Sequence, residues 1–191
     1  MLGKETMATL FNYTLQTDDS KSPEIYDLKA AHENAGAERA VLISLGGNDY
    51  NHQKGHIPSN ETFTAAYISF LDQLLTSYGY APEGEGSDDD GDGGLPAPTL
   101  ISVCGQGSPV EAKQDPDNNR CRPCPHVEAA TEAYNQRKTS AYRAEYIFVP
   151  CDGTVVTGAG DIGCAGHKNA IGQGEVAAFV GPKVREIMGW N

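Results

Sequence analysis

The sequence predicts an α/β fold built around a parallel β-sheet, and three observations lead to this expectation. Residues 40–45 (AVLISL), 99–103 (TLISV) and 146–149 (YIFV) are short, continuous apolar runs, typical of strands buried on both faces. A helical pattern of apolar residues follows each run. Strands that alternate with helices are typical of parallel sheets with right-handed crossovers. We therefore expect one domain over residues 1–191.

The first helix is the element that the sequence defines most sharply. Ser59 or Asn60 can cap its N-terminus, and Gly79 can end it. Between them, apolar side chains recur at the 3.6-residue spacing of a helix that packs one face on a core. They are Phe63, Tyr67, Phe70, Leu71, Leu74, Leu75 and Tyr78.

Two further helices are expected. The second covers about residues 127–142 and the third about residues 169–188. The apolar positions of the second are Ala130, Ala133 and Tyr134. In the third, Pro182 follows a glycine, and we expect a kink there because proline cannot donate a backbone hydrogen bond.

The charge balance excludes several classes of partner. The chain has 14 Lys and Arg against 26 Asp and Glu, which gives a formal net charge of −12. Binding to a phosphate backbone needs clustered basic residues, so we expect no nucleic-acid partner. The sequence has neither a basic amphipathic stretch nor an apolar run of about 20 residues, so we expect no membrane partner. An acidic globular monomer is the remaining expectation.

Two segments interrupt the pattern of strands and helices. Residues 83–98 read as a low-complexity acidic linker that is rich in Gly and Pro, and residues 104–125 as a loop rich in Cys and Pro. Residues 88–93 (DDDGDG) fit the first half of a calcium-binding loop. Its twelfth position is Thr99 rather than Glu, and two nearby prolines oppose the helix that should follow. A solvated linker is therefore the better interpretation, and we expect no metal or cofactor.

The chain has five cysteines, so at least one thiol lacks a partner within it. They are Cys104, Cys121, Cys124, Cys151 and Cys164. The spacing Cys121-x-x-Cys124, followed by His126, could form a zinc site together with Cys104. The same spacing could form a redox pair at a helix N-terminus.

A disulfide is the simpler interpretation of the Cys-rich loop if the protein is secreted. It could be local or could reach Cys104, and a bridge between Cys151 and Cys164 would hold the segment that carries His167. Sequence alone fixes none of these pairings. We expect an extracellular protein or one in the secretory pathway, although the first residues lack the apolar core of a signal peptide.

Two segments carry candidate chemistry, because sites in parallel sheets form in the loops that follow the strands. Residues 46–49 (GGND) directly follow the first strand, where two glycines permit a sharp turn and an Asn amide can donate to an oxyanion. An ordinary turn is the alternative interpretation. Residues 161–169 (DIGCAGHKN) follow the third strand and contain His167, a candidate general base.

In this order and about 120 residues apart, the two segments resemble those of the SGNH (GDSL-type) hydrolases, and within them carbohydrate esterase family two, which includes enzymes like acetyl xylan esterase. Residues 41–49 resemble the G-x-N-D block, residues 61–72 the helix after it, and residues 7–18 the segment before it. Residues 163–169 (GCAGHKN) resemble the block with the catalytic His. The resemblance implies a three-layer, flavodoxin-like fold.

The resemblance also implies roles for individual residues in acyl-ester hydrolysis. His167 would deprotonate a serine nucleophile and then protonate the leaving alcohol. The side-chain amide of Asn48 would be one donor to the oxyanion, and Gly46 and Asp49 would shape the turn. The implied substrate is an acetylated polysaccharide or a small ester, and no cofactor is required.

Two departures from the family pattern matter. The chain contains no Gly-Asp-Ser, so the family's nucleophile is absent. We therefore expect a C-terminal part of an esterase domain, lacking the first strands and inactive alone. Many relatives have an Asp shortly before the His, where this chain has Cys164 and Ala165, and the nearest carboxylate is Asp161. Some relatives work as a Ser–His dyad with the His oriented by a backbone carbonyl.

Two other functions stay open at this point. One is a non-catalytic relative that binds carbohydrate without releasing acetate. The other is an interaction module stapled by cysteines or folded around zinc, which chelation would unfold.

Overall fold

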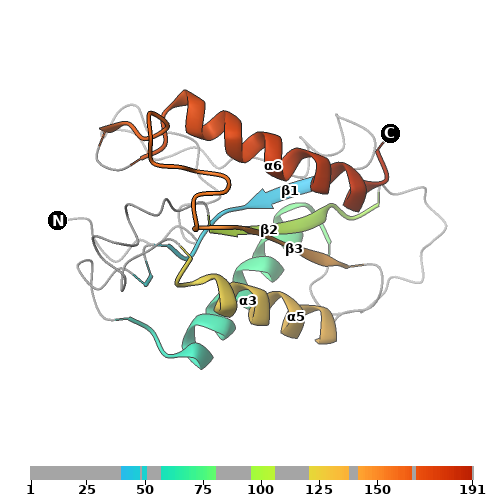
Figure 1. The fold of residues 1–191 in the computed structure, drawn as a ribbon. Helices are drawn as coiled ribbons and strands as arrows, with labels where there is room; N and C mark the ends of the chain where they lie inside the picture. The colour runs from blue at the N-terminus through green and yellow to red at the C-terminus, as the bar shows by residue number, and fades with distance from the viewer. Residues whose placement is uncertain are drawn as a thin grey trace, which may run out of the picture.

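The computed structural model describes residues 40–47, 49–50, 57–80, 96–105, 121–137, 142–164 and 167–190. Within them, strands and helices alternate along the chain (Figure 1). The elements in order are β1 (Ala40–Ile43), α3 (Asn60–Ser77), β2 (Thr99–Gly105), α5 (Cys124–Arg137), β3 (Ala144–Val149) and α6 (Ala170–Met188).

The three strands form one parallel sheet in the order β1-β2-β3. Ala40 pairs with Thr99, and Leu100 pairs with Ala144. Helices α3 and α5 lie on one face of the sheet and α6 lies on the other (Figure 1). The predicted α/β fold with a parallel sheet is therefore confirmed, and its layout is consistent with a flavodoxin-like arrangement.

The face covered by α3 and α5 contains most of the core. Leu71 and Leu74 of α3 and Tyr134 of α5 are almost completely buried there. The predicted α3 is confirmed, and its cap is Ser59, whose Oγ accepts a hydrogen bond of 3.2 Å from the amide of Thr62.

A buried polar cluster lies within this apolar layer. The Tyr67 hydroxyl of α3 donates to Oγ of Ser102 on β2 at 2.9 Å, and Oγ1 of Thr131 on α5 lies 3.3 Å from the same Oγ. Burial raises the pKa of Tyr67 to about 12. The cluster joins all three elements, because each buried hydroxyl has a partner on a neighbouring one.

Helix α6 covers the opposite face with a stripe of valines. Val176, Val180 and Val184 recur every four residues and pack with buried residues of β2 and β3 such as Ile101. At the N-terminus, Oδ1 of Asn169 accepts hydrogen bonds from two amides of the first turn. The helix then continues through Pro182 to Met188.

Helix α5 begins earlier than the apolar pattern indicated, at Cys124 rather than Val127. Pro125 is tolerated in this first turn because the missing amide hydrogen would have no partner within the helix. The carbonyl of Pro123 accepts hydrogen bonds from the amides of His126 and Val127. The predicted loop at residues 104–125 is therefore shorter, because β2 extends to Gly105 and α5 begins at Cys124. Residues 106–120 of this loop lie outside the described residues.

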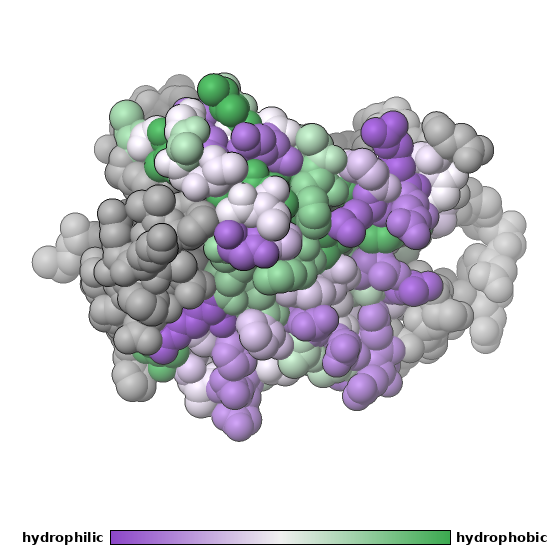
Figure 2. Space-filling view, viewed as in Figure 1, coloured by the Kyte–Doolittle hydropathy of each residue, from purple (hydrophilic) through white to green (hydrophobic). Residues whose placement is uncertain are grey.

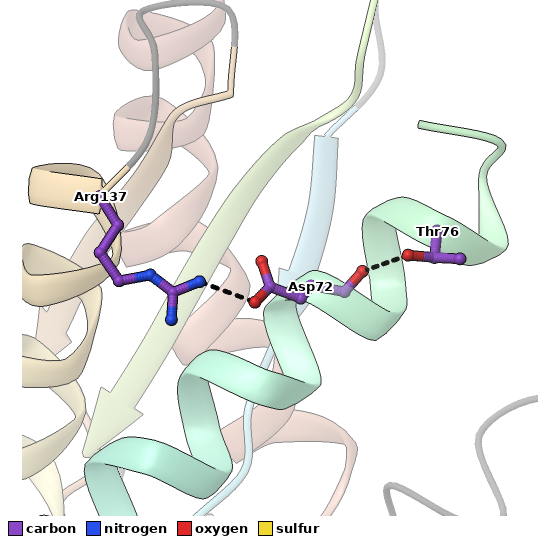
Figure 3. A network of polar contacts seen from close by, with 3 residues as sticks. All are labelled: Asp72, Thr76 and Arg137. Atoms are coloured by element: carbon purple, nitrogen blue, oxygen red, sulfur yellow. Dashed lines mark hydrogen bonds and ion pairs between the residues drawn. The ribbon is translucent and has the colours of Figure 1, made fainter. Parts of the chain in front are cut away.

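An ion pair joins the two helices of the larger layer. Nη2 of Arg137, in the last turn of α5, lies 2.8 Å from Oδ2 of Asp72 on α3 (Figure 3). The backbone carbonyl of Asp72 also accepts a hydrogen bond from Oγ1 of Thr76. Both groups of the ion pair retain solvent contact, so it adds at most about 1 kcal/mol to stability.

The two outer strands of the described sheet have different environments. On β3, the side chain of Asn135 donates to the carbonyl of Ala144 and accepts from its amide, at 2.8 and 2.9 Å. On β1, the side chain of Leu42 is 53% exposed, and Phe148 near the end of β3 is 45% exposed. Figure 2 shows apolar surface between the α6 layer and the layer of α3 and α5.

The described helices include none with the length and hydropathy needed to cross a bilayer.

Candidate functional site

His167 lies in a closely hydrogen-bonded loop between β3 and α6, which we call the His167 loop (residues 157–169). Its two arms are joined by an antiparallel bridge between Ile162 and Lys168. The amide of Gly163 donates to the carbonyl of His167 at 2.7 Å, and the amide of His167 donates to the carbonyl of Cys164 at 3.0 Å. The backbone therefore holds His167 in place, while its side chain is exposed.

Asp161 is the anchor of this loop. It is only 1% exposed, and its Oδ2 accepts hydrogen bonds from the amide of Thr157 at 2.7 Å, the hydroxyl of Thr157 at 2.8 Å and the amide of Gly158 at 3.1 Å. Burial acts to raise the pKa of Asp161, but these donors outweigh it and lower the pKa. The amide of Asn169 donates to the Asp161 carbonyl at 3.0 Å.

The side chain of Asp161 therefore holds its own loop and makes no hydrogen bond with His167. Across the described residues, no group accepts a hydrogen bond from the His167 imidazole. The carboxylate nearest in sequence does not supply an orienting acid, and neither does a described backbone carbonyl.

The predicted turn after β1 is present in the described residues. Gly46 has a φ of +100°, a backbone conformation that favours glycine, and its carbonyl accepts a hydrogen bond from the amide of Asp49 at 3.1 Å. A Cβ on Gly46 would meet the ring of Phe63 at 3.2 Å. Desolvation raises the pKa of Asp49, with a smaller opposing effect from its own backbone amide. Asn48 lies outside the described residues.

An aromatic cluster lies directly after this turn. Tyr50 is 4% exposed, and its ring stacks on that of His126 at the start of α5, with centroids 4.8 Å apart. The ring of Phe63 meets Tyr50 edge-on at 5.3 Å. This cluster fixes the turn against the first turns of α3 and α5. The sequence does not predict this cluster, because a single Tyr and a single His carry no periodic signal.

Two disulfides lie at the same end of the sheet. Cys104 pairs with Cys124, with Cα atoms 5.4 Å apart, and Cys121 pairs with Cys151, with Cα atoms 6.1 Å apart. Of the two alternatives for the Cys-rich loop, the link to Cys104 is confirmed, and Cys121 and Cys124 do not pair with each other. The expected bridge from Cys151 to Cys164 is wrong, because Cys151 faces Cys121 across the end of the sheet and Cys164 is an exposed free thiol.

The zinc alternative is also wrong. Its three cysteines, Cys104, Cys121 and Cys124, are all oxidised in disulfides and are not available as thiolate ligands. Within the described ranges, no group of three His, Cys, Asp or Glu side chains could hold a metal ion. The acidic calcium-like pattern at residues 88–93 lies outside the described residues, as does most of the predicted linker at 83–98.

A shallow groove of about 740 Å³ lies away from these segments. It follows the outer side of α3 from Asn60 to Asp72 and ends against Arg137 of α5. None of the candidate site residues lines it, so it does not contribute to the predicted site.

The candidate residues thus fall on two loops at one end of the sheet. Gly46 and Asp49 follow β1, His167 follows β3, and β2 lies between these strands (Figure 1). Among the described candidate residues, no hydrogen bond, ion pair or ring contact joins Gly46 or Asp49 to His167. The arrangement agrees with a site at the carboxyl ends of parallel strands. Comparison with protein-family models, curated proteins and solved structures finds no match.

Proposed function

We propose that this chain carries the general base and the oxyanion turn of an SGNH-like esterase that removes acetyl groups from a carbohydrate. The observation that carries the proposal is that the G-x-N-D turn and the His167 loop both follow the carboxyl ends of strands in one parallel sheet. Catalytic groups of open α/β sheets gather at that end.

In this reaction, His167 accepts the proton of a serine hydroxyl as the serine attacks the ester carbonyl, and later gives the proton to the leaving alcohol. The amide of Asn48 donates to the oxyanion that forms on the carbonyl oxygen. The exposed imidazole is accessible to a polymer substrate, and the hydrogen-bonded backbone of the His167 loop limits its movement. The serine is not part of either matched segment.

Secretion is part of the same proposal. Two disulfides fit an oxidising compartment, where acetylated polysaccharides of cell walls are found. The three-layer esterase fold requires a further strand beside β1, which is an edge strand of the described sheet.

The first experiment is to determine the intact mass and N-terminal sequence of the native protein. A longer form with an upstream Gly-Asp-Ser would then be tested for acetate release from acetylated xylan oligosaccharides. We expect His167→Ala to abolish turnover and Asn48→Ala to slow it by about 100- to 1,000-fold. Cys164→Ser is the matched control in the same loop, and unchanged turnover in the His167 variant would refute the assignment.

A non-catalytic, carbohydrate-binding protein is the second candidate. It is favoured by one observation, that Asp161 is engaged with Thr157 and Gly158 and leaves the His167 imidazole without an orienting partner in the described structure. Calorimetric titration with acetylated and deacetylated oligosaccharides separates the two functions. Binding of both forms without acetate release would support this second candidate.

A further inference from the structure

Two carboxyl groups meet where the His167 loop lies on α6. Asp161 belongs to the loop, and Glu175 lies on α6. Oδ1 of Asp161 and Oε2 of Glu175 are both buried and have no hydrogen-bond partner. The charge of Asp161 raises the pKa of Glu175, so the two side chains are neighbours.

These two oxygens are complementary only if one carboxyl group is protonated. An ionised carboxylate can only accept hydrogen bonds, whereas a carboxylic acid also donates one. A buried polar atom without a hydrogen-bond partner is destabilising, and two neighbouring carboxylates also repel each other. A single proton between the groups removes both costs.

The surroundings decide which group holds that proton. Burial and then the charge of Asp161 raise the pKa of Glu175. Asp161 is held in its ionised form by the donors from Thr157 and Gly158. The acid is therefore Glu175 and the acceptor is Asp161.

We propose that the carboxylic acid of Glu175 donates a hydrogen bond to Oδ1 of Asp161, and that this acid pair holds the His167 loop on α6 until rising pH ionises Glu175. Loop and helix are already in close contact beside the pair, because a Cβ on Gly172 would overlap the carbonyl oxygen of Asp161. The acid pair is independent of the ester-hydrolysis proposal, since it concerns the attachment of the loop and not its chemistry.

Other charged groups of the packed elements do not account for this pairing. On β3, Glu145 forms an ion pair with Arg143, and the remaining residues that face α6 are apolar. The other charged groups of the loop and of α6 are His167, Lys168, Lys183, Arg185 and Glu186. None of them is a cause of the raised pKa of Glu175, which comes from burial and from Asp161.

The direction of the pH effect follows from the directions in which folding shifts the pKa of Glu175 and of Asp161. Because folding raises the pKa of Glu175, its stabilising contribution is complete below the unfolded pKa and is lost as pH rises through the folded pKa. Because folding lowers the pKa of Asp161, its contribution is lost only as pH falls through that lower value. The loop is therefore held most firmly at mildly acidic pH.

The test uses the full chain and follows hydrogen exchange of two loop amides, corrected for intrinsic exchange at each pH. These are Asn169, which donates to the Asp161 carbonyl, and Gly163, which donates to the His167 carbonyl. We expect protection to fall between pH 5 and pH 8, by about tenfold for each unit by which the pKa of Glu175 is higher in the attached loop than in the open loop. Carbon-13 titration of the two carboxyl groups gives their pKa values directly.

Two matched variants isolate the acid pair. Glu175→Gln places an amide donor beside Asp161 at every pH and should abolish the fall in protection. Glu186→Gln removes the same charge from an exposed position of the same helix and should retain the fall, which controls for the net charge of −12.

Three results would overturn the proposal. Glu175 could titrate at its ordinary pKa, a measurement on the unaltered protein that decides the matter even if the variant does not fold. The two variants could lose protection equally. Millimolar Ca²⁺ could restore protection at pH 8 and EDTA remove it again, in which case the two oxygens hold a cation and not a proton.

Discussion

Removal of the Cys121–Cys151 disulfide should lower the free energy of unfolding by about 3.6 kcal/mol. This bridge closes a loop over a sequence separation of 30 residues. The chain-entropy relation gives a loss of about 12 cal/mol/K for a loop of that length, which is about 3.6 kcal/mol at 25 °C. The same relation gives about 3.3 kcal/mol for Cys104–Cys124, whose separation is 20 residues.

Urea unfolding of the double variant Cys121→Ser/Cys151→Ser, followed by circular dichroism, measures this loss. Both cysteines are replaced so that no reactive thiol remains to form new pairs. Cys164→Ser is the control and should change stability by less than about 0.5 kcal/mol, because its thiol is free and exposed.

The chain segments closed by the two disulfides, residues 104–124 and 121–151, overlap at residues 121–124. Removal of both disulfides should cost less than the sum of the separate losses, because they constrain the same part of the unfolded chain. A stability loss in Cys164→Ser as large as that of the double variant would refute the pairing. So would a peptide joining Cys151 to Cys164 in a non-reduced digest.

Three further predictions concern the layer of α3. Ser102→Ala should cost about 1–3 kcal/mol in urea unfolding, because it leaves the buried hydroxyl of Tyr67 without its acceptor, whereas Ser69→Ala on the exposed face should be nearly neutral. The raised pKa of Tyr67, about 12, means that its stabilising contribution is complete below pH 10 and is lost as pH rises through about 12. Absorbance titration at 295 nm should show a step there for Tyr67 and Tyr146 together, and Tyr67→Phe should reduce it by the absorbance of one tyrosine. Ser59→Ala should lower the free energy of unfolding by about 1 kcal/mol through loss of the N-cap, and an unchanged urea midpoint would contradict the capping role.

Elements with a strong local signal could be predicted from the sequence. The run at residues 40–45 is apolar because Val41, Ile43 and Leu45 pack on the core under α3 and α5, and such runs are visible without a structure. The start of α3 was also clear, because Ser59 is a good cap and the apolar residues after it follow the helical period. Helix α5 had a weaker signal, and it ends at Arg137, before the predicted end near residue 142. The kink expected at Pro182 stays a prediction, since α6 continues through this residue.

The candidate site depends on contacts between distant segments, which no local pattern records. The pairing of Cys121 with Cys151 follows from the order of the strands, and spacing along the chain favours closer partners such as Cys164. Glu175 has no distinguishing signal in the sequence, because its importance comes from Asp161 on the loop beneath it. The roles of Asn48 and His167 in ester hydrolysis stay predictions.

The side chain of Asn135 hinders the addition of a further strand at the β3 edge of the sheet. The carbonyl of Arg143 bonds to the amide of Leu100 on β2, so the amide and carbonyl of the next residue, Ala144, point away from β2. Asn135 occupies both groups, as an added strand would. An incoming chain can therefore pair only with the later part of β3, while β1 keeps its full length for this purpose in the described structure. Extension of the sheet, whether by another part of this protein or during aggregation, is thereby directed to the β1 edge.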